Sequence, residues 1–276
     1  VKLLPFLTFK SSIALDLVRN QSDSFRPSYY LDGDEYSTYA GASRSVANKD
    51  YWVFDNYLTY NQKFDKHAVT AMVGTSAEKE RYEEIYAYKE GQVNNNPNQQ
   101  IINAGTMNPA ASGYYATSTL NSYFGRVFYS FDNRYMITAN IRWDGSSKFA
   151  DGNRWGYFPS FSAGWVMSNE SWMENTKNWM DFLKVRASWG QNGNENIGAY
   201  KYASTYAFGD LGLYSFNNNK NGGTQGAYPS LLPNNEITWE TSEQTNVGLD
   251  ARFLNGRLNA NFDWYSKKTK DLLIDV

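Results

Sequence analysis

Polar and apolar residues alternate along much of this chain, and the alternation is clearest in YMITANIRWD, residues 135–144. One set of alternate positions is apolar, with an aromatic residue at each end: Tyr135, Ile137, Ala139, Ile141 and Trp143. The other set is mostly polar: Met136, Thr138, Asn140, Arg142 and Asp144. A period of two residues predicts a β-strand whose two faces meet different surroundings.

The same period recurs often enough to predict an all-β protein with about ten strands. The alternating segments are residues 7–17, 51–64, 67–79, 121–131, 157–168, 181–191, 245–253 and 258–264. Two of the junctions have turn-forming residues at hairpin spacing, Asp132-Asn133 and Leu254-Asn255-Gly256. Successive strands are therefore expected to pair antiparallel.

Helix signals are few. Residues 76–91 fit either a helix, capped by Ser76 and ended by Gly91, or a charged continuation of the strand before them. Residues 168–180 predict a short helix between strands, with Ser168 or Asn169 as its cap. Apolar runs stay below the ~20 residues that a membrane-spanning helix needs, and the first residues lack the pattern of a signal peptide.

Long polar segments separate several of the predicted strands. They cover residues 20–50, 91–118 and 191–235, and they are rich in Asn, Gly and Ser. Connections of this length are uncommon in compact domains and usually carry function. Because tight turns such as FDNRY and FLNGR alternate with them along the chain, the sequence predicts a sheet with short turns at one end and long loops at the other.

Composition removes several classes of function. The chain has 26 Lys and Arg against 28 Asp and Glu, so it lacks the basic excess of nucleic-acid-binding proteins. Without any cysteine it can form no disulfide or thiolate metal site, and with one histidine no multi-histidine metal site. The 22 Tyr, 16 Phe and 9 Trp are many for a chain this polar, and suit a β-structure with much polar surface.

Two architectures fit the alternation, a soluble β-sandwich and a transmembrane β-barrel. The barrel is favoured because the polar faces carry mainly Asn, Ser, Gly, Arg and Asp, and because apolar faces end in aromatic rings, as at membrane interfaces. The aromatic ends are Trp143, Trp165, Trp189, Phe253 and Trp264. In a barrel, Ile137, Ala139 and Ile141 would face lipid, and Asn140, Arg142 and Asp144 would face the lumen.

Longer motifs narrow the choice. Residues 125–173, 182–202 and 234–273 contain RWDGSS, FPSFSAGW, SWGQNGN and TWE, and these segments closely resemble the barrel of SusC/RagA-type TonB-dependent transporters. The resemblance covers 119–276 well and 1–91 more loosely. It implies an all-β, antiparallel transmembrane β-barrel segment with long extracellular loops. The complete barrel would have about 22 strands, as plugged outer-membrane transporters do.

The resemblance also implies a non-enzymatic function. It implies import of nutrient oligomers, glycans or peptides, across the Gram-negative outer membrane, with a SusD-like surface lipoprotein as partner. Energy would come from TonB, acting through an N-terminal plug. We expect residues 1–276 to be the middle part of such a barrel, because no plug domain, TonB box, signal peptide or closing C-terminal strand is recognisable.

Candidate ligand contacts lie in the loops and at the end of one strand. Tyr206, Phe208, Tyr214 and Phe216 have rings that suit stacking on sugars, although the same rings suit packing of the loop on itself. Arg142 and Asp144, followed by Ser146 and Ser147, suit a polar contact at the barrel mouth, although they equally suit positioning of the loop. No cofactor is expected, apart from calcium at Asp32, Asp34 and Glu35, which lack the full loop pattern of a calcium site.

Other polar groups have plainer interpretations. His67 is expected in a turn, although it could titrate near neutral pH. Glu170, Glu174 and Asp181 are expected at helix or strand starts rather than as a glycosidase pair. Two rival functions remain open at this stage: a soluble carbohydrate-binding β-sandwich module and a passive porin-type channel.

Overall fold

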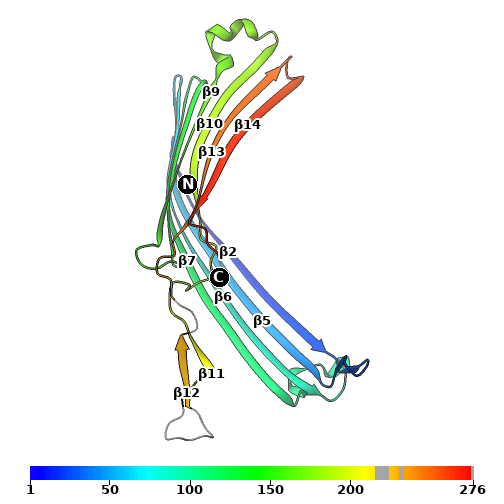
Figure 1. The fold of residues 1–276 in the computed structure, drawn as a ribbon. Helices are drawn as coiled ribbons and strands as arrows, with labels where there is room; N and C mark the ends of the chain where they lie inside the picture. The colour runs from blue at the N-terminus through cyan, green and yellow to red at the C-terminus, as the bar shows by residue number, and fades with distance from the viewer. Residues whose placement is uncertain (215–223, 230–232, 275–276) are drawn as a thin grey trace. The chain divides into compact units, whose positions relative to one another are not determined.

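A computed structural model describes residues 1–214, 224–229 and 233–274, most of which form one ten-stranded sheet (Figure 1). Strands that follow one another in this sheet are neighbours, as the hairpin turns predict. Its strands are β1 (Lys2–Leu4), β2 (Leu7–Arg26), β5 (Ala40–Phe64), β6 (His67–Gln92), β7 (Met107–Phe131), β8 (Tyr135–Ser146), β9 (Trp155–Val166), β10 (Met180–Asn194), β13 (Glu240–Phe253) and β14 (Leu258–Lys270).

Two small hairpins lie in the connections. One consists of β3 (Tyr29–Tyr30) and β4 (Tyr36–Ser37), and the other of β11 (Tyr206–Tyr214) and β12 (Thr224–Pro229). The described helices are short 3₁₀ segments: η1 (Pro97–Gln99), η2 (Ile102–Ala104), η3 (Met167–Asn169) and η4 (Ser171–Thr176). Within the described residues, no helix is long and apolar enough to span a membrane.

The tight turns follow the sequence prediction closely. Asp132, Asn133, Leu254 and Asn255 all have φ between 50° and 55°, and Gly256 has φ 82°. This left-handed region is where Asn, Asp and Gly are best tolerated, so the local sequence favours these hairpins, with Leu254 as the exception.

The long connections are shorter than predicted, because the strands beside them are longer. Between β2 and β5 only residues 27–39 lie outside the main sheet, and between β6 and β7 only 93–106. Strand β10 likewise continues to Asn194. The sequence pattern did not predict these strand ends, because both of their faces are largely polar and the alternation of polar and apolar residues is lost.

Residues 76–91 are strand, which settles the ambiguity between helix and strand. Glu78 accepts a hydrogen bond from Tyr51 on β5 (2.7 Å), and Glu84 accepts one from Ser45 (2.8 Å). Pairing with the preceding strand β5 thus outweighs the local helix propensity of Glu and Lys. The short helix over 168–180 is confirmed as η3 and η4, but neither Ser168 nor Asn169 caps it; the N-cap positions are Val166 and Glu170.

The chain divides into two compact units, which we describe separately. Unit 1 contains residues 1–12, 54–77 and 120–276, and unit 2 contains 13–53 and 78–119. In unit 1, the outward face of the sheet is strongly exposed, as predicted for residues facing lipid: Ile137 is 55% exposed and Phe161 is 53% exposed.

Two rows of aromatic rings border this outward face. Register aligns Phe131, Tyr135 and Trp165 in one row, and Tyr123, Trp143 and Tyr157 in the other. Eight residues separate the rows on β8, or about 26 Å along a strand, which becomes roughly 20 Å at a tilt of ~40°. That distance is close to the ~25 Å apolar band of an outer-membrane barrel.

Candidate functional site

The inward face of unit 1 is a wall of amide and hydroxyl groups. Cross-strand register brings polar residues of β8, β9, β10 and β13 side by side around a shallow hollow. Its inward polar lining is Asn140, Ser160, Ser162, Ser188, Asn192, Gln244 and Asn246.

These groups are held by one another and keep hydrogen-bonding capacity for a ligand. Asn140 donates to Ser160 (3.0 Å), and Asn246 donates to Ser188 (3.3 Å). Gln244 donates to the side-chain oxygen of Asn246 (2.8 Å). An amide has two N–H donors and two acceptor lone pairs, so each side chain retains groups that match the hydroxyls of sugars or the amides of peptides.

A charged cluster adjoins this wall. Arg186 on β10 bonds Asp250 on β13 (3.1 Å) and Asp263 on β14 (2.6 Å). A Cβ atom on Gly248 would lie 2.4 Å from the Arg186 guanidinium carbon, so glycine there leaves room for the cation. Arg186, Lys184 and Ser188 line a second inward hollow beside the first.

The predicted pair Arg142 and Asp144 is brought together, but the two side chains bind each other. Arg142 Nε lies 2.8 Å from both Asp144 oxygens, and Nη2 donates to Ser122 (2.9 Å). Asp144 is buried. Ser146, further along, accepts a turn hydrogen bond from the Lys148 amide. The contacts fit the positioning role, and direct contact with a ligand stays a prediction.

The predicted loop aromatics lie on a different element. Tyr206 and Phe208 are two residues apart on β11, share one face, and are 62% and 70% exposed. Tyr214 lies at the end of the same strand, and Phe216 lies outside the described residues. The exposed rings provide an apolar surface for a ligand, and this use also stays a prediction.

The acidic candidates are each engaged locally. Asp32 accepts hydrogen bonds from the Asp34 and Glu35 amides (2.9 and 2.8 Å), which lower the pKa of its carboxyl. Glu174 faces Lys177, and Asp181 pairs with Arg252. Over the described ranges no three His, Cys, Asp or Glu side chains gather as a metal site would require. His67 is the first residue of β6 rather than a turn residue, and its Nδ1 lies 2.7 Å from the Tyr129 hydroxyl.

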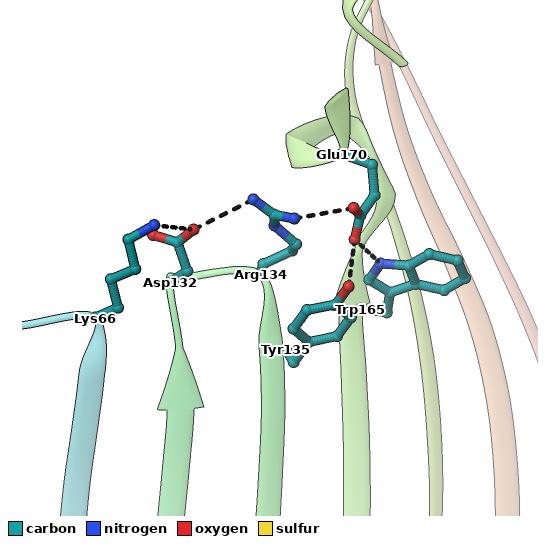
Figure 2. Close-up of polar contacts among 6 residues, drawn as sticks. All are labelled: Lys66, Asp132, Arg134, Tyr135, Trp165 and Glu170. Carbon is teal, nitrogen blue, oxygen red and sulfur yellow. Dashed lines mark hydrogen bonds and ion pairs between the residues drawn. The ribbon is translucent and has the colours of Figure 1, made fainter. Parts of the chain in front are cut away.

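Glu170 belongs to a network that sequence reasoning missed (Figure 2). It accepts hydrogen bonds from the Tyr135 hydroxyl (2.6 Å) and the Trp165 indole (3.0 Å), and it pairs with Arg134 (2.9 Å). These contacts lower the pKa of the Glu170 carboxyl, with the Tyr135 hydrogen bond as the largest cause.

The network then continues to neighbouring turns. Arg134 also bonds Asp132 (3.2 Å), which faces Lys66 at 3.6 Å. The network therefore links three connections on the short-turn side of the sheet, namely those that follow β5, β7 and β9. The alternating pattern could not reveal this network because most of its members lie in or beside turns.

A second missed feature explains the long motifs. Phe149, Phe158 and Trp239 form the buried cluster of unit 1, and the Trp239 indole donates to the Arg154 carbonyl (2.9 Å). Cβ atoms on Gly156 and Gly193 would lie 2.4 and 2.1 Å from the Phe158 ring, so both glycines admit it. FPSFSAGW, SWGQNGN and TWE thus meet in one packed cluster.

An antiparallel sheet with an apolar outward face between two aromatic rows, and a hydroxyl- and amide-lined inward face, defines the wall of an outer-membrane β-barrel. The family model described as TonB dependent receptor-like, beta-barrel matches residues 6–276. The chain therefore belongs to the TonB-dependent receptor family, as a segment of its outer-membrane barrel.

Individual relatives agree with this assignment. The chain is 34% identical to TonB-dependent receptor P39 of Formosa agariphila over 100% of its own length and 26% of the relative's. It is 33% identical to TonB-dependent receptor SusC of Bacteroides thetaiotaomicron, covering 99% of itself and 26% of SusC. It also superposes on a structure of the RagAB peptide transporter with a TM-score of 0.85 and 25% identity, covering 99% of itself and 29% of that chain.

The chain thus spans about a quarter of the length of its relatives. The barrel is of the SusC and RagA type, as the motifs predicted, and it resides in the outer membrane. The alternative prediction of a soluble carbohydrate-binding β-sandwich is wrong, because the match to the barrel family covers nearly the whole chain.

Proposed function

We propose that the complete protein imports nutrient oligomers, glycans or peptides, through a TonB-dependent barrel of which this chain forms part of the wall. The main observation behind this proposal is the inward face of amides and hydroxyls, which cross-strand hydrogen bonds hold in place. Such groups exchange hydrogen bonds with hydroxyls or peptide amides as a solute passes. We propose no chemical change to the cargo.

Structural relatives support peptides as cargo, and the glycan alternative rests on the resemblance of the motifs to SusC-type transporters. One structural relative is a peptide transporter and another a peptide importer, whereas SusC is known by its name only as a TonB-dependent receptor. The Arg186 cluster has two carboxylates to one guanidinium and would suit the amino terminus or basic side chains of a peptide, and the uncharged wall would suit either class. We propose TonB and a SusD-like surface lipoprotein as partners, on the strength of the resemblance to SusC and RagA.

Uptake by the full-length protein tests the role of the wall. Ser188→Val with Asn246→Leu removes two groups shared by both inward hollows. We expect the half-saturating concentration of cargo to rise roughly five-fold for each ligand hydrogen bond lost, since each is worth about 1 kcal/mol. Uptake would be measured in cells with labelled oligosaccharide and peptide mixtures.

The control is Val247→Leu, an outward neighbour on the same strand. Unchanged uptake in the double variant would show that the wall does not contact cargo. Uptake that survives collapse of the inner-membrane proton gradient would instead favour the passive porin-type channel.

A further inference from the structure

The connection between β2 and β5 carries a hairpin whose shape is fixed from within. Strands β3 and β4 pair with Tyr30 opposite Tyr36, and the Leu31 amide donates to the Glu35 carbonyl (3.0 Å). Asp32 closes the tip by accepting hydrogen bonds from two backbone amides. Side-chain oxygens of Asp commonly order turns in this way.

This hairpin is also tied to the next long connection, residues 93–106. The Ser28 amide donates to Asn95 Oδ1 (3.0 Å), and Asn95 Nδ2 donates back to the Ser28 carbonyl (2.9 Å). Both connections belong to unit 2 and follow the distal ends of β2 and β6 (Figure 1). The double contact reduces the entropy that the hairpin would lose on binding a partner.

The fixed hairpin presents bare apolar side chains. Tyr30 is 73% exposed, Leu31 67% and Tyr36 55%, and the two tyrosine rings lie 6.1 Å apart. In the part of the chain that the structure describes, nothing covers them. Tyrosine gives large contact area at low entropic cost and is enriched at the energetic centres of protein interfaces.

The charge of the hairpin indicates the kind of partner. Residues 27–39 contain Asp32, Asp34 and Glu35 and no Lys or Arg. Three carboxylates repel anionic lipid headgroups and attract a protein surface rich in Lys and Arg.

We propose that Tyr30, Leu31 and Tyr36, bordered by these carboxylates, form a docking site for a protein that offers an apolar depression with a basic rim. This inference rests on the proposed function, which supplies the occupant: the surface lipoprotein. The hairpin holds that lipoprotein through the rings, and the carboxylates orient it.

The test uses the full-length protein, affinity-purified in mild detergent from its own cells. Tyr30→Ser with Tyr36→Ser should lower the amount of co-purified lipoprotein roughly tenfold or more, as expected for truncation of interface anchors. Asp34→Asn with Glu35→Gln should lower it less and should reduce the loss of partner caused by 0.5 M salt. The lipoprotein would be identified by mass spectrometry, and heat-modifiable gel migration would verify that each barrel is folded.

Val93→Ser is the matched control, because Val93 is 86% exposed in the neighbouring connection but lies outside the hairpin. Equal recovery of lipoprotein with the wild type and the tyrosine variant would overturn the docking site. Loss of the lipoprotein from the wild type on EDTA treatment would also overturn it, in favour of a bridging cation. Absence of any lipoprotein from the wild-type preparation would instead refute the partner in the proposed function.

Discussion

Glu170 is the residue whose surroundings give the sharpest local prediction. Its carboxylate is nearly buried and receives three donors, from Arg134, Tyr135 and Trp165. These contacts favour the ionised form, so its folded pKa lies below the ordinary 4.5. A depressed pKa means that Glu170 contributes stability above the unfolded pKa and loses that contribution as pH falls through the folded value.

We therefore expect Glu170→Gln to lower the temperature at which the folded barrel shifts on a heat-modifiable gel at pH 7. The difference from the wild type should begin to shrink as pH falls below about 4.5, and it should vanish as pH falls through the lower pKa of the folded protein, where the native carboxylate becomes protonated. Glu174→Gln serves as the comparison, because Glu174 is exposed and faces only Lys177 at 3.9 Å. A pH-independent difference would contradict the role given to the charge.

Single residues were the hardest level to predict from the sequence. Arg142 and Asp144 were correctly placed on the inward face, but their mutual pairing depends on Ser122 of a neighbouring strand. The Phe158 cluster draws on segments that are far apart in the sequence, so no local pattern indicates it. The long motifs were the only sign of it in the sequence: they contain Phe158, Trp239 and Gly193, which leaves room for the Phe158 ring.

At the scale of the strand, the two faces of β8 predict opposite tolerance to charge. Ile137 lies on the outward face between the aromatic rows, whereas Asn140 lies on the inward face. We expect Ile137→Arg to reduce the yield of assembled full-length barrel, because arginine on the lipid face near mid-bilayer costs about 2–4 kcal/mol. Asn140→Arg should assemble close to the wild-type level.

Heat-modifiable migration of outer-membrane fractions measures this difference. Leu249→Arg on β13 and Asn259→Arg on β14 provide a second pair with the same contrast. Equal yields from outward and inward substitutions would refute the assignment of the faces.

Strands and tight turns were largely predictable because their determinants are local. The period of two residues fixes the faces, and residues such as Asn133 and Gly256 fix the turns. Strand ends were missed where both faces become polar, as in β6 beyond Ser76. There only the partner strand distinguishes strand from helix, and the partner is not visible in the local sequence.

At the scale of the whole sheet, residues 1–276 produced alone should not behave as a soluble monomer. The described sheet is open, with β1 and β14 at its edges, and its outward apolar side chains are bare. Unpaired edges and large apolar faces promote association. We expect aggregation in plain buffer and dispersion in detergent, measured by size-exclusion chromatography. A monodisperse monomer with a cooperative thermal transition would contradict this expectation.

The membrane location was predictable at this scale because most strands repeat the same contrast between faces, and the barrel type was predictable from the resemblance of the long motifs. The cargo was not. It depends on side chains that meet across strands, such as Asn246 and Ser188, and on segments beyond this chain.

The length of β6 has a consequence for biogenesis. The strand has 26 residues, whereas a membrane crossing uses about ten. From Glu78 to Glu90 it carries eight charged residues, and carrying each alone into hydrocarbon costs about 2.5–3.5 kcal/mol, or roughly 20 kcal/mol or more in sum. The segment therefore cannot thread through the bilayer as a single extended strand. We therefore expect β6 to cross together with its neighbour β5, whose Lys49 neutralises Glu80 of β6.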